Sequence, residues 1–167
     1  SVYKLVSLSV PSTIKPSIAS FTASSSVTTG TFANLYVQGK TSVILSATAS
    51  AGAGASIVSY TYSGPNVSSV ITSSSTSSSF TTGTLQSSGS LKYTVTVKDS
   101  RGRTATREVT IYCQPYATPK ISYVAVQRCD ANGNLSDSGT YAKYTVNSTY
   151  STVNGKNTRT VTVAYSS

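Results

Sequence analysis

Residues 91–113 read LKYTVTVKDSRGRTATREVTIYC and contain two alternating apolar and polar runs on either side of the segment DSRG. Alternation with a period of two is typical of half-buried β-strands. Asp99 suits the opening of a turn, and Gly102 can supply a positive φ. The stretch therefore predicts a β-hairpin with one buried face. Its predicted inward residues are Tyr93, Val95, Val97, Val109, Ile111 and Cys113.

The same stretch carries six charged residues between Lys98 and Glu108, in a chain with 13 basic and 4 acidic residues and a net charge of +9. Such a balance favours polyanionic partners. The basic residues elsewhere stand alone, without a run of like charges. The hairpin also lacks the interleaved aromatic residues on which single-stranded bases stack. A solvated hairpin tip is therefore favoured over a nucleic-acid site, and we expect no nucleic-acid partner.

Alternation extends along most of the chain, and no long window shows helical spacing. A Ser/Thr-rich run around Phe80 precedes the hairpin directly, so we interpret it as an edge strand and loop inside a domain. The sequence predicts an all-β fold. Further predicted strand positions are Ile18, Phe21 and Ala23, then Val43, Leu45 and Ala47, then residues 57–62 and 67–71.

An internal repeat indicates tandem modules. Pro16-Ser-Ile recurs as Pro119-Lys-Ile, Gly30-Thr-Phe-Ala as Gly139-Thr-Tyr-Ala, and Gly39-Lys-Thr as Gly155-Lys-Asn. The offsets grow from 103 through 109 to 116 residues, which is close to the size of a β-sandwich of about 100 residues. We expect residues 1–12 to be the last strand of a preceding module, and 13–114 to be one complete immunoglobulin-like (Ig-like) sandwich. Residues 115–167 are expected to be the first half of a further module, or a small β domain.

The inventory of reactive groups argues against catalysis. The chain has no His, so the usual general base is missing. Its four carboxylates are Asp99, Glu108, Asp130 and Asp137, and each has an evident turn or strand-surface role. No Ser lies in a G-x-S-x-G motif, and the AGAGA segment lacks the Lys of a phosphate loop. We predict no enzyme activity, no catalytic residues and no cofactor.

The segment RCDANGNLSDSGTY (residues 128–141) has two interpretations. Asp130, Asn132 and Asn134 have the alternate spacing of a calcium loop, with Asp137 beyond. The twelfth position is Tyr141, where an EF-hand needs a bidentate Glu. Asn-Gly is also a strong hairpin signal. A turn is favoured, no metal residues are assigned, and calcium binding stays open.

Cys113 and Cys129 are the only cysteines. Two thiols without His cannot complete a zinc site. Both positions suit a small apolar residue on a strand, so free buried thiols are favoured, although the pairing is left open.

Tyrosine is the remaining candidate for ligand contact, because it can stack on sugar rings or pack at an interface. Tyr60 and Tyr62 share one parity, and Tyr141, Tyr144 and Tyr150 lie near turns. A place in the core is favoured over a subunit interface or a glycan contact.

The repeated Pro-x-Ile, the RCDANGNLSDSGTYAKYTV segment, the NGKNTRTVTVAY ending and the 91–113 hairpin together resemble the Ig-like repeats of minor structural proteins in the tails of siphophages of Gram-positive bacteria. The resemblance spans residues 6–167 and is looser over 24–90. It implies tandem extracellular sandwiches on the virion tail, and it brings no catalytic residues.

The expected function is that of a non-enzymatic phage tail or fibre segment, acting as a spacer and in host-surface adhesion. Expected partners are other tail chains, including copies of this chain, and anionic cell-wall polymers or glycans. No membrane partner is expected. No run of 18 apolar residues is present, and the sequence does not indicate how the protein reaches its compartment. A bacterial cell-surface Ig-like adhesin and a carbohydrate-binding module of a larger enzyme are the alternatives.

Overall fold

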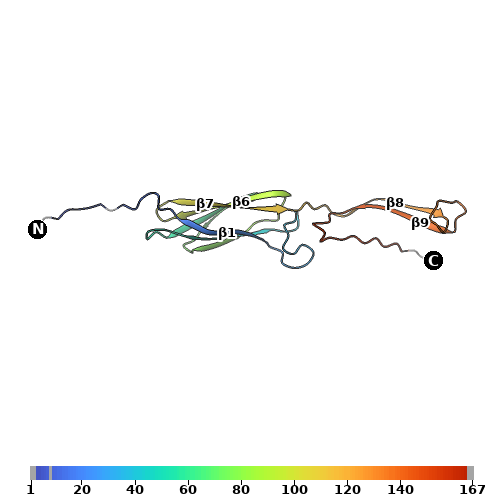
Figure 1. Cartoon of the computed structure of the whole chain (residues 1–167), viewed down its shortest axis with the longest axis horizontal. Helices are drawn as coiled ribbons and strands as arrows, with labels where there is room; N and C mark the ends of the chain where they lie inside the picture. Colours follow the sequence, from blue (N-terminus) through green and yellow to red (C-terminus); the bar gives the residue numbers. More distant parts are fainter. Residues whose placement is uncertain (1–2, 8, 165–167) are drawn as a thin grey trace. The chain divides into compact units, whose positions relative to one another are not determined.

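The computed structural model describes residues 3–7 and 9–164 and divides the chain into two compact units, Ser1–Gln114 and Pro115–Ser167, called unit 1 and unit 2 below. The described residues form strands and loops, with no helix among them. The prediction of an all-β chain is confirmed (Figure 1). The strands are β1 (Ser17–Ser25), β2 (Val43–Ser50), β3 (Ile57–Gly64), β4 (Val67–Thr72), β5 (Ser77–Thr81), β6 (Gly89–Asp99), β7 (Thr104–Cys113), β8 (Lys120–Cys129) and β9 (Tyr141–Thr149).

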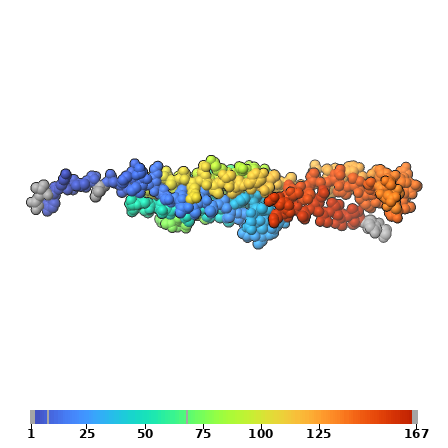
Figure 2. All heavy atoms as spheres, viewed as in Figure 1, coloured from blue at the N-terminus to red at the C-terminus, as the bar shows by residue number. Residues whose placement is uncertain are grey.

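Unit 1 is a sandwich of two sheets with strand orders β1-β2-β5 and β4-β3-β6-β7. All ladders are antiparallel, and β1 also lies against β7. In the space-filling view the yellow atoms of the β6–β7 region lie next to the blue atoms of β1 (Figure 2). The Ser/Thr-rich run forms β5, an edge strand, because Phe80 turns inward opposite Leu45 while its neighbours face solvent. This agrees with the sequence interpretation.

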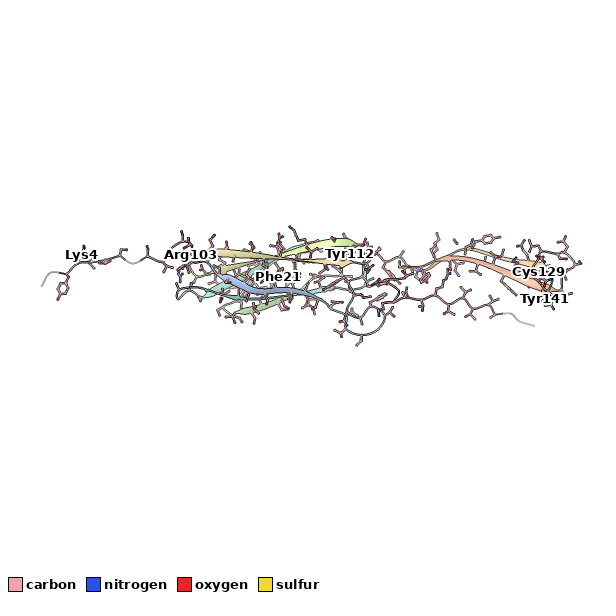
Figure 3. All side chains as sticks on the ribbon, in the orientation of Figure 1. Lys4, Phe21, Arg103, Tyr112, Cys129 and Tyr141 are labelled. Atoms are coloured by element: carbon pink, nitrogen blue, oxygen red, sulfur yellow. The ribbon has the colours of Figure 1, made fainter. Side chains whose placement is uncertain are left out.

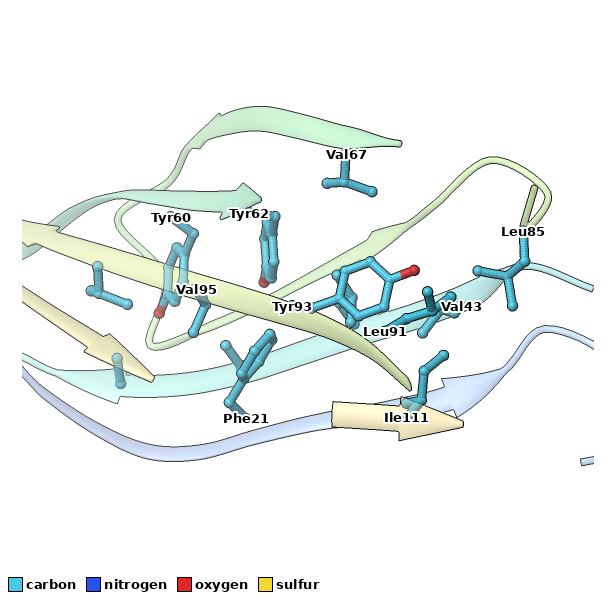
Figure 4. Close-up of a cluster of buried hydrophobic side chains, with 14 of the residues drawn as sticks. Phe21, Val43, Tyr60, Tyr62, Val67, Leu85, Leu91, Tyr93, Val95 and Ile111 are labelled. Atoms are coloured by element: carbon cyan, nitrogen blue, oxygen red, sulfur yellow. The ribbon is translucent and has the colours of Figure 1, made fainter. Parts of the chain in front are cut away.

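The core of unit 1 lies between the two sheets and is rich in tyrosine. Tyr60, Tyr62 and Tyr93 are fully buried (Figure 4). The ring of Tyr62 stacks on Phe80 at 5.8 Å between centroids and is tilted against Phe21 at 6.2 Å. Because burying one large apolar side chain contributes about 1.5–3 kcal/mol, these rings join the two layers firmly. The expectation that tyrosine belongs mainly to the core is confirmed for these three residues.

The predicted hairpin is β6–β7. It pairs in continuous register from Gly89 opposite Cys113 to Lys98 opposite Thr104, and the inward residues predicted from the alternation face the core. Asp99 closes the turn as expected, because its carboxylate accepts hydrogen bonds from the backbone N–H groups of Arg101 and Arg103 at 3.0 and 2.9 Å. Gly102 has the expected positive φ of 80°.

The outer face of the β1-β2-β5 sheet is covered by hydroxyl groups. Its cross-strand rows contain Ser20, Thr48 and Ser77, then Thr22, Ser46 and Ser79, then Ser24, Ile44 and Thr81. The hydroxyls of Ser20 and Thr48 lie 2.6 Å apart, and those of Ser46 and Ser79 lie 3.3 Å apart. No residue in the range 41–91 is charged, so this face carries no formal charge from β2 or β5.

Unit 2 contains the β8–β9 hairpin, which repeats the geometry of the β1–β2 pair. In unit 1 a register shift falls between Ile18 and Ser20, and in unit 2 one falls between Ile121 and Tyr123. In both hairpins the residue before the shift is an Ile two positions after a Pro. The repeat of Pro16-Ser-Ile as Pro119-Lys-Ile therefore marks a shared structural position.

The second pair of repeated motifs does not mark a shared position. Gly30 lies in a turn within the connection between β1 and β2, far from the start of β2, and its carbonyl accepts a hydrogen bond from the N–H of Ala33. Gly139 instead lies only two positions before Tyr141, the first residue of β9. The third pair is equivalent only as a turn. Gly39 and Gly155 both have positive φ, and in both turns the following Lys N–H donates to a buried Val carbonyl. The first turn leads into β2, while the second leads into residues 158–164, which form no strand.

Residues 1–12 were expected to be the last strand of a preceding module. The described part, residues 3–7 and 9–12, forms no β-ladder, and residues 1, 2 and 8 lie outside the described residues. The expected module boundaries therefore stay predictions.

Candidate functional site

The charged turn of β6–β7 was the first candidate site, and its arginines bind backbone carbonyls of unit 1. Arg103 donates from Nη1 to the carbonyl of Ile14 at 2.6 Å and from Nη2 to that of Val10 at 2.8 Å. Arg107 donates from Nη1 to the carbonyls of Ile18 and Ala19 at 3.0 and 2.7 Å. The guanidinium groups thus connect the hairpin to the segment that precedes β1 and to β1 itself.

Arg101 has the same role toward another loop. Its Nη2 donates to the carbonyls of Gly52 and Ala53, which follow β2. Figure 3 shows Arg103 at the end of unit 1 where the N-terminal segment enters. The interpretation of the charged stretch as a structural hairpin tip is supported, because these cations hold loops by hydrogen bonds.

Asp99 is the buried carboxylate of this turn, with 1% of its surface exposed. Its Oδ1 accepts the two turn N–H groups, while Oδ2 has no hydrogen-bond partner, and neither has the buried Nη1 of Arg101. A buried carboxylate is costly unless it is hydrogen-bonded. The two bonds from the turn N–H groups therefore stabilise the carboxylate of Asp99 in its buried position.

The other carboxylates lie in separate places. Glu108 on β7 forms an exposed ion pair with Lys92 at 3.0 Å, an interaction worth about 0–1 kcal/mol at a surface. Asp130 and Asp137 belong to the β8–β9 loop of unit 2. Among the described residues, no three His, Cys, Asp or Glu side chains gather in a group that could hold a metal ion.

The β8–β9 loop is closed by Asp130. Its Oδ1 accepts the N–H groups of Asn132 and Asn134 at 2.8 and 2.9 Å, and its Oδ2 accepts the side-chain amide of Asn134 at 3.1 Å. The side-chain bond from Asn134, followed by the backbone bonds, lowers the pKa of Asp130 below its usual value. Both carboxylate oxygens therefore close a hydrogen-bonded turn, in line with the favoured interpretation of DANGNLSD.

The close approach of Gly139 to Cys129 explains why the GTY triplet begins with glycine. A Cβ at this position would lie 2.1 Å from the carbonyl oxygen of Cys129. Cys129 is buried by this close approach and pairs with Tyr141 at the loop end of the hairpin (Figure 3). Cys113 is buried in the core of unit 1, and both thiols are free, as the sequence favoured.

The core placement favoured for the tyrosines is wrong for Tyr141 and Tyr144 of unit 2. Tyr141 and Tyr144 are exposed, and the guanidinium of Arg159 lies 5.3 Å from the ring centroid of Tyr150. A groove of about 460 Å³ lies beside Tyr150, between the open ends of β8 and β9 and residues 157–162. Arg159 also donates to the carbonyl and hydroxyl of Ser148 at 2.9 and 2.8 Å, so its guanidinium is held by hydrogen bonds to a residue that lines the groove.

Sequence reasoning missed two features. Arg103 and Arg107 donate to backbone carbonyls about 90 residues away in the sequence, and no local sequence pattern predicts such contacts. The apolar face of β8–β9 could have been found, because Ile121, Val124 and Val126 fall on one face once the register shift is allowed.

No helix among the described residues is long and apolar enough to cross a membrane. No curated protein and no solved structure matches the chain. One family model does match, and it covers the part of unit 1 that runs from the β1–β2 connection to the end of β7. Residues 32–113 of this all-β chain match the model of the K319L-like PKD domain, a family of Ig-like β-sandwiches.

Proposed function

We propose that the chain is a non-enzymatic segment of a phage tail or fibre protein, acting as a spacer and as a weak host-surface adhesin on the virion. The family match supports an Ig-like module, and the residues that resemble siphophage tail repeats supply the assignment to a tail. Residues 115–167 would then be part of a further module. Other tail chains, including copies of this one, are the proposed partners.

The observation that carries the spacer role is the contact of Arg103 with the N-terminal segment. Two hydrogen bonds fix the carbonyls of Val10 and Ile14 to the β6–β7 turn, and the N–H of Ile14 donates to the carbonyl of Pro11. Pro fixes φ, so the segment between Pro11 and Pro16 has few conformations left. A stiff entry into the sandwich suits a module that transmits position along a fibre.

This role can be tested with Arg103→Ala. Loss of the two bonds should release residues 10–14, and exchange of the Ile14 amide, which donates to the carbonyl of Pro11, should rise at least about tenfold while β6 and β7 keep their protection. Arg107→Ala, which removes contacts to β1 instead, is the matched control. Unchanged exchange of the Ile14 amide would show that Arg103 does not stiffen this segment.

The adhesive role rests on the net charge of +9. Lys side chains such as Lys98 and Lys143 lie on the surface and suit anionic wall polymers, which weak repeated contacts would hold by avidity. The test is co-sedimentation with purified Gram-positive cell walls. Binding should fall steeply as salt rises to about 0.5 M, where the Debye length is only a few ångströms. Binding that does not change with salt would exclude an electrostatic mechanism.

The alternatives have their own readouts. A signal peptide and wall anchor in the reading frame would favour a bacterial adhesin, whereas neighbouring tape-measure or holin genes would favour the phage. Glycan binding that survives high salt and is lost on Tyr141→Ala or Tyr144→Ala would favour a carbohydrate-binding module, because stacking on aromatic rings is insensitive to salt.

A further inference from the structure

The charges of unit 2 are divided between the two ends of its hairpin. Both carboxylates of the unit, Asp130 and Asp137, lie in the β8–β9 loop. Two cations donate to the same loop, since Arg128 bonds to the carbonyl of Asp137 at 3.2 Å and Lys143 bonds to that of Gly133 at 3.0 Å. The loop end therefore carries two positive and two negative charges, which cancel.

The opposite end, where β8 begins and β9 ends, carries the positive charge that remains in unit 2. Lys120 is the first residue of β8 and pairs with Thr149, and the turn that follows β9 is followed in turn by Lys156 and Arg159. At about 3.4 Å per residue, the length of β8 separates Lys120 from the loop carboxylates by about 30 Å. This is several Debye lengths at physiological salt, so the carboxylates do not compensate the three cations.

The groove of unit 2 lies at this cationic end. Its volume of about 460 Å³ is within the range of about 300–1,000 Å³ that is typical of ligand sites. Its lining contains Lys120 and Arg159 and no carboxylate. The lining also contains hydroxyl-bearing side chains from both of its walls, which are Ser148, Thr149, Thr158, Thr160 and Thr162. Such a lining is complementary to a ligand that carries both negative charges and hydroxyl groups.

Arg159 is already held in the orientation that an anion needs. Its Nη1 donates to the carbonyl and hydroxyl of Ser148, and its guanidinium lies over the ring of Tyr150. Its Nε and Nη2 bond to no described residue, and two such N–H groups fit two oxygens of one phosphate or carboxylate. Because the side chain is ordered before binding, an oxyanion is bound with little further loss of conformational entropy.

The ring of Tyr150 favours one kind of anionic chain over another. Proteins bind single-stranded nucleic acids by stacking bases on aromatic rings, but here the guanidinium of Arg159 occupies one face of the ring. No second aromatic side chain is found among the described residues that line the groove. A polyol or sugar needs hydrogen-bonding groups instead, which the Ser and Thr hydroxyls supply. An anionic polyol therefore fits the groove better than a nucleic acid.

We infer that the groove of unit 2 binds the oxyanions of an anionic polyol or sugar chain. Arg159 and Lys120 contact the phosphate or carboxylate groups, the Ser and Thr hydroxyls contact the hydroxyl groups, and Lys156 adds to the positive potential at this end. The inference rests on the proposed adhesive function and deepens it, because it assigns the binding of wall polymers to one groove.

The test is an NMR titration of the full chain with a short poly(glycerol phosphate) chain. Amide shifts should change at residues 120, 148–150 and 157–162. Lys120→Gln with Lys156→Gln should weaken binding about tenfold, because each exposed ionic contact contributes up to about fivefold. Both side chains are exposed and bond to no described residue, so the hairpin should keep its structure, which circular dichroism checks.

The matched control is Lys4→Gln with Lys15→Gln, which lowers the net charge by the same amount. Both of these lysines are exposed residues of unit 1, and neither lines the groove. Their removal should weaken binding by less than about twofold. Equal weakening by the two double variants would overturn the inference, because the polymer would then respond to net charge alone. Shift changes confined to residues outside the groove would overturn it as well.

A second variant tests the recognition of the oxyanion at constant charge. Arg159→Lys removes the planar pair of N–H groups and should weaken binding at least about threefold. Unchanged affinity would show that Arg159 does not contact the anion. Polygalacturonate in place of poly(glycerol phosphate) distinguishes carboxylate from phosphate as the preferred oxyanion. Tighter binding of a single-stranded oligonucleotide than of both polymers would overturn the inference in favour of a nucleic-acid site.

Purified cell walls separate this inference from the proposed adhesion. Walls that bind the wild type and both double variants equally would leave adhesion standing and would overturn the groove as its site. Binding of the polymer in the groove without binding to walls would support the groove and contradict the adhesive function.

Discussion

Tyr93 and Tyr60 are both fully buried, but they differ in one hydrogen bond. The hydroxyl of Tyr60 donates to the carbonyl of Ser75 at 3.0 Å, whereas the hydroxyl of Tyr93 has no hydrogen-bond partner. A buried hydroxyl without a partner retains its desolvation cost, and removing it relieves that cost.

We therefore expect opposite results from the same chemical change. Tyr60→Phe should lower the free energy of unfolding by about 1 kcal/mol, and Tyr93→Phe should leave it unchanged or raise it by up to about 1 kcal/mol. Urea denaturation followed by circular dichroism measures both. Equal destabilisation by the two variants would contradict the assigned hydrogen bonding.

The core of unit 1 also predicts alkaline instability. Burial raises the pKa of the Cys113 thiol above 9.0, and burial followed by the nearby Cys113 and Tyr36 raises the pKa of Tyr93 above 10.0. In the unfolded chain both groups lose their protons first. Their contribution to stability is therefore complete below about pH 9 and falls as pH rises through the folded pKa values.

This can be measured as the urea midpoint between about pH 7 and pH 11. The midpoint should hold up to about pH 9 and then decline. Cys113→Ala, although less stable at neutral pH, should decline less steeply just above about pH 9 than the wild type. An identical pH profile for the two proteins would show that the thiol does not contribute.

At the scale of elements, the close approach of Gly139 to Cys129 decides whether the β8–β9 hairpin can close. Gly139→Ala requires the backbone of Cys129 to move, since the new Cβ would overlap its carbonyl. We expect a loss of about 3 kcal/mol or more from unit 2, because the overlap is with backbone rather than with a flexible side chain. Gly133 has a φ of 82° with open space around it, so Gly133→Ala should cost only about 1–2 kcal/mol.

Amide hydrogen exchange in β8 and β9 reports this difference, because it measures opening of unit 2 separately from unit 1. Gly139→Ala should deprotect both strands, while Gly133→Ala should affect mainly the loop. A hairpin that tolerates the two changes equally would mean that the contact at Cys129 relaxes at little cost.

The strands also show which features of the fold can be predicted from the sequence. The alternation in residues 91–113 predicts β6, β7, their turn and their buried face, because side-chain parity in a strand is local. The roles of Asp99 and Gly102 are local for the same reason. The contacts of Arg103 are not, since they depend on how the hairpin meets a segment far away in the chain. The repeat of Gly30-Thr-Phe-Ala as Gly139-Thr-Tyr-Ala wrongly predicts equivalent positions for the two glycines, because short glycine motifs occur in turns of many kinds.

On the scale of the whole molecule, the two units should differ in stability. Unit 1 buries a two-layer core, whereas unit 2 leaves the apolar face of its hairpin open. At low concentration we expect amides of β8 and β9 to exchange through openings of lower free energy than those of β3 and β6, which should approach the about 5–15 kcal/mol of a stable domain. Equal opening energies in all four strands would contradict this.

The uncharged stretch that includes β2 to β5 has a consequence for digestion. Proteases of the trypsin class cut after Lys or Arg, and neither residue occurs between Lys40 and Lys92. Such a protease can trim the ends of unit 1 and its β6–β7 hairpin, but it finds no cleavage point from β2 to β5 even when the sandwich is open. A transient opening therefore leaves these strands on one continuous peptide.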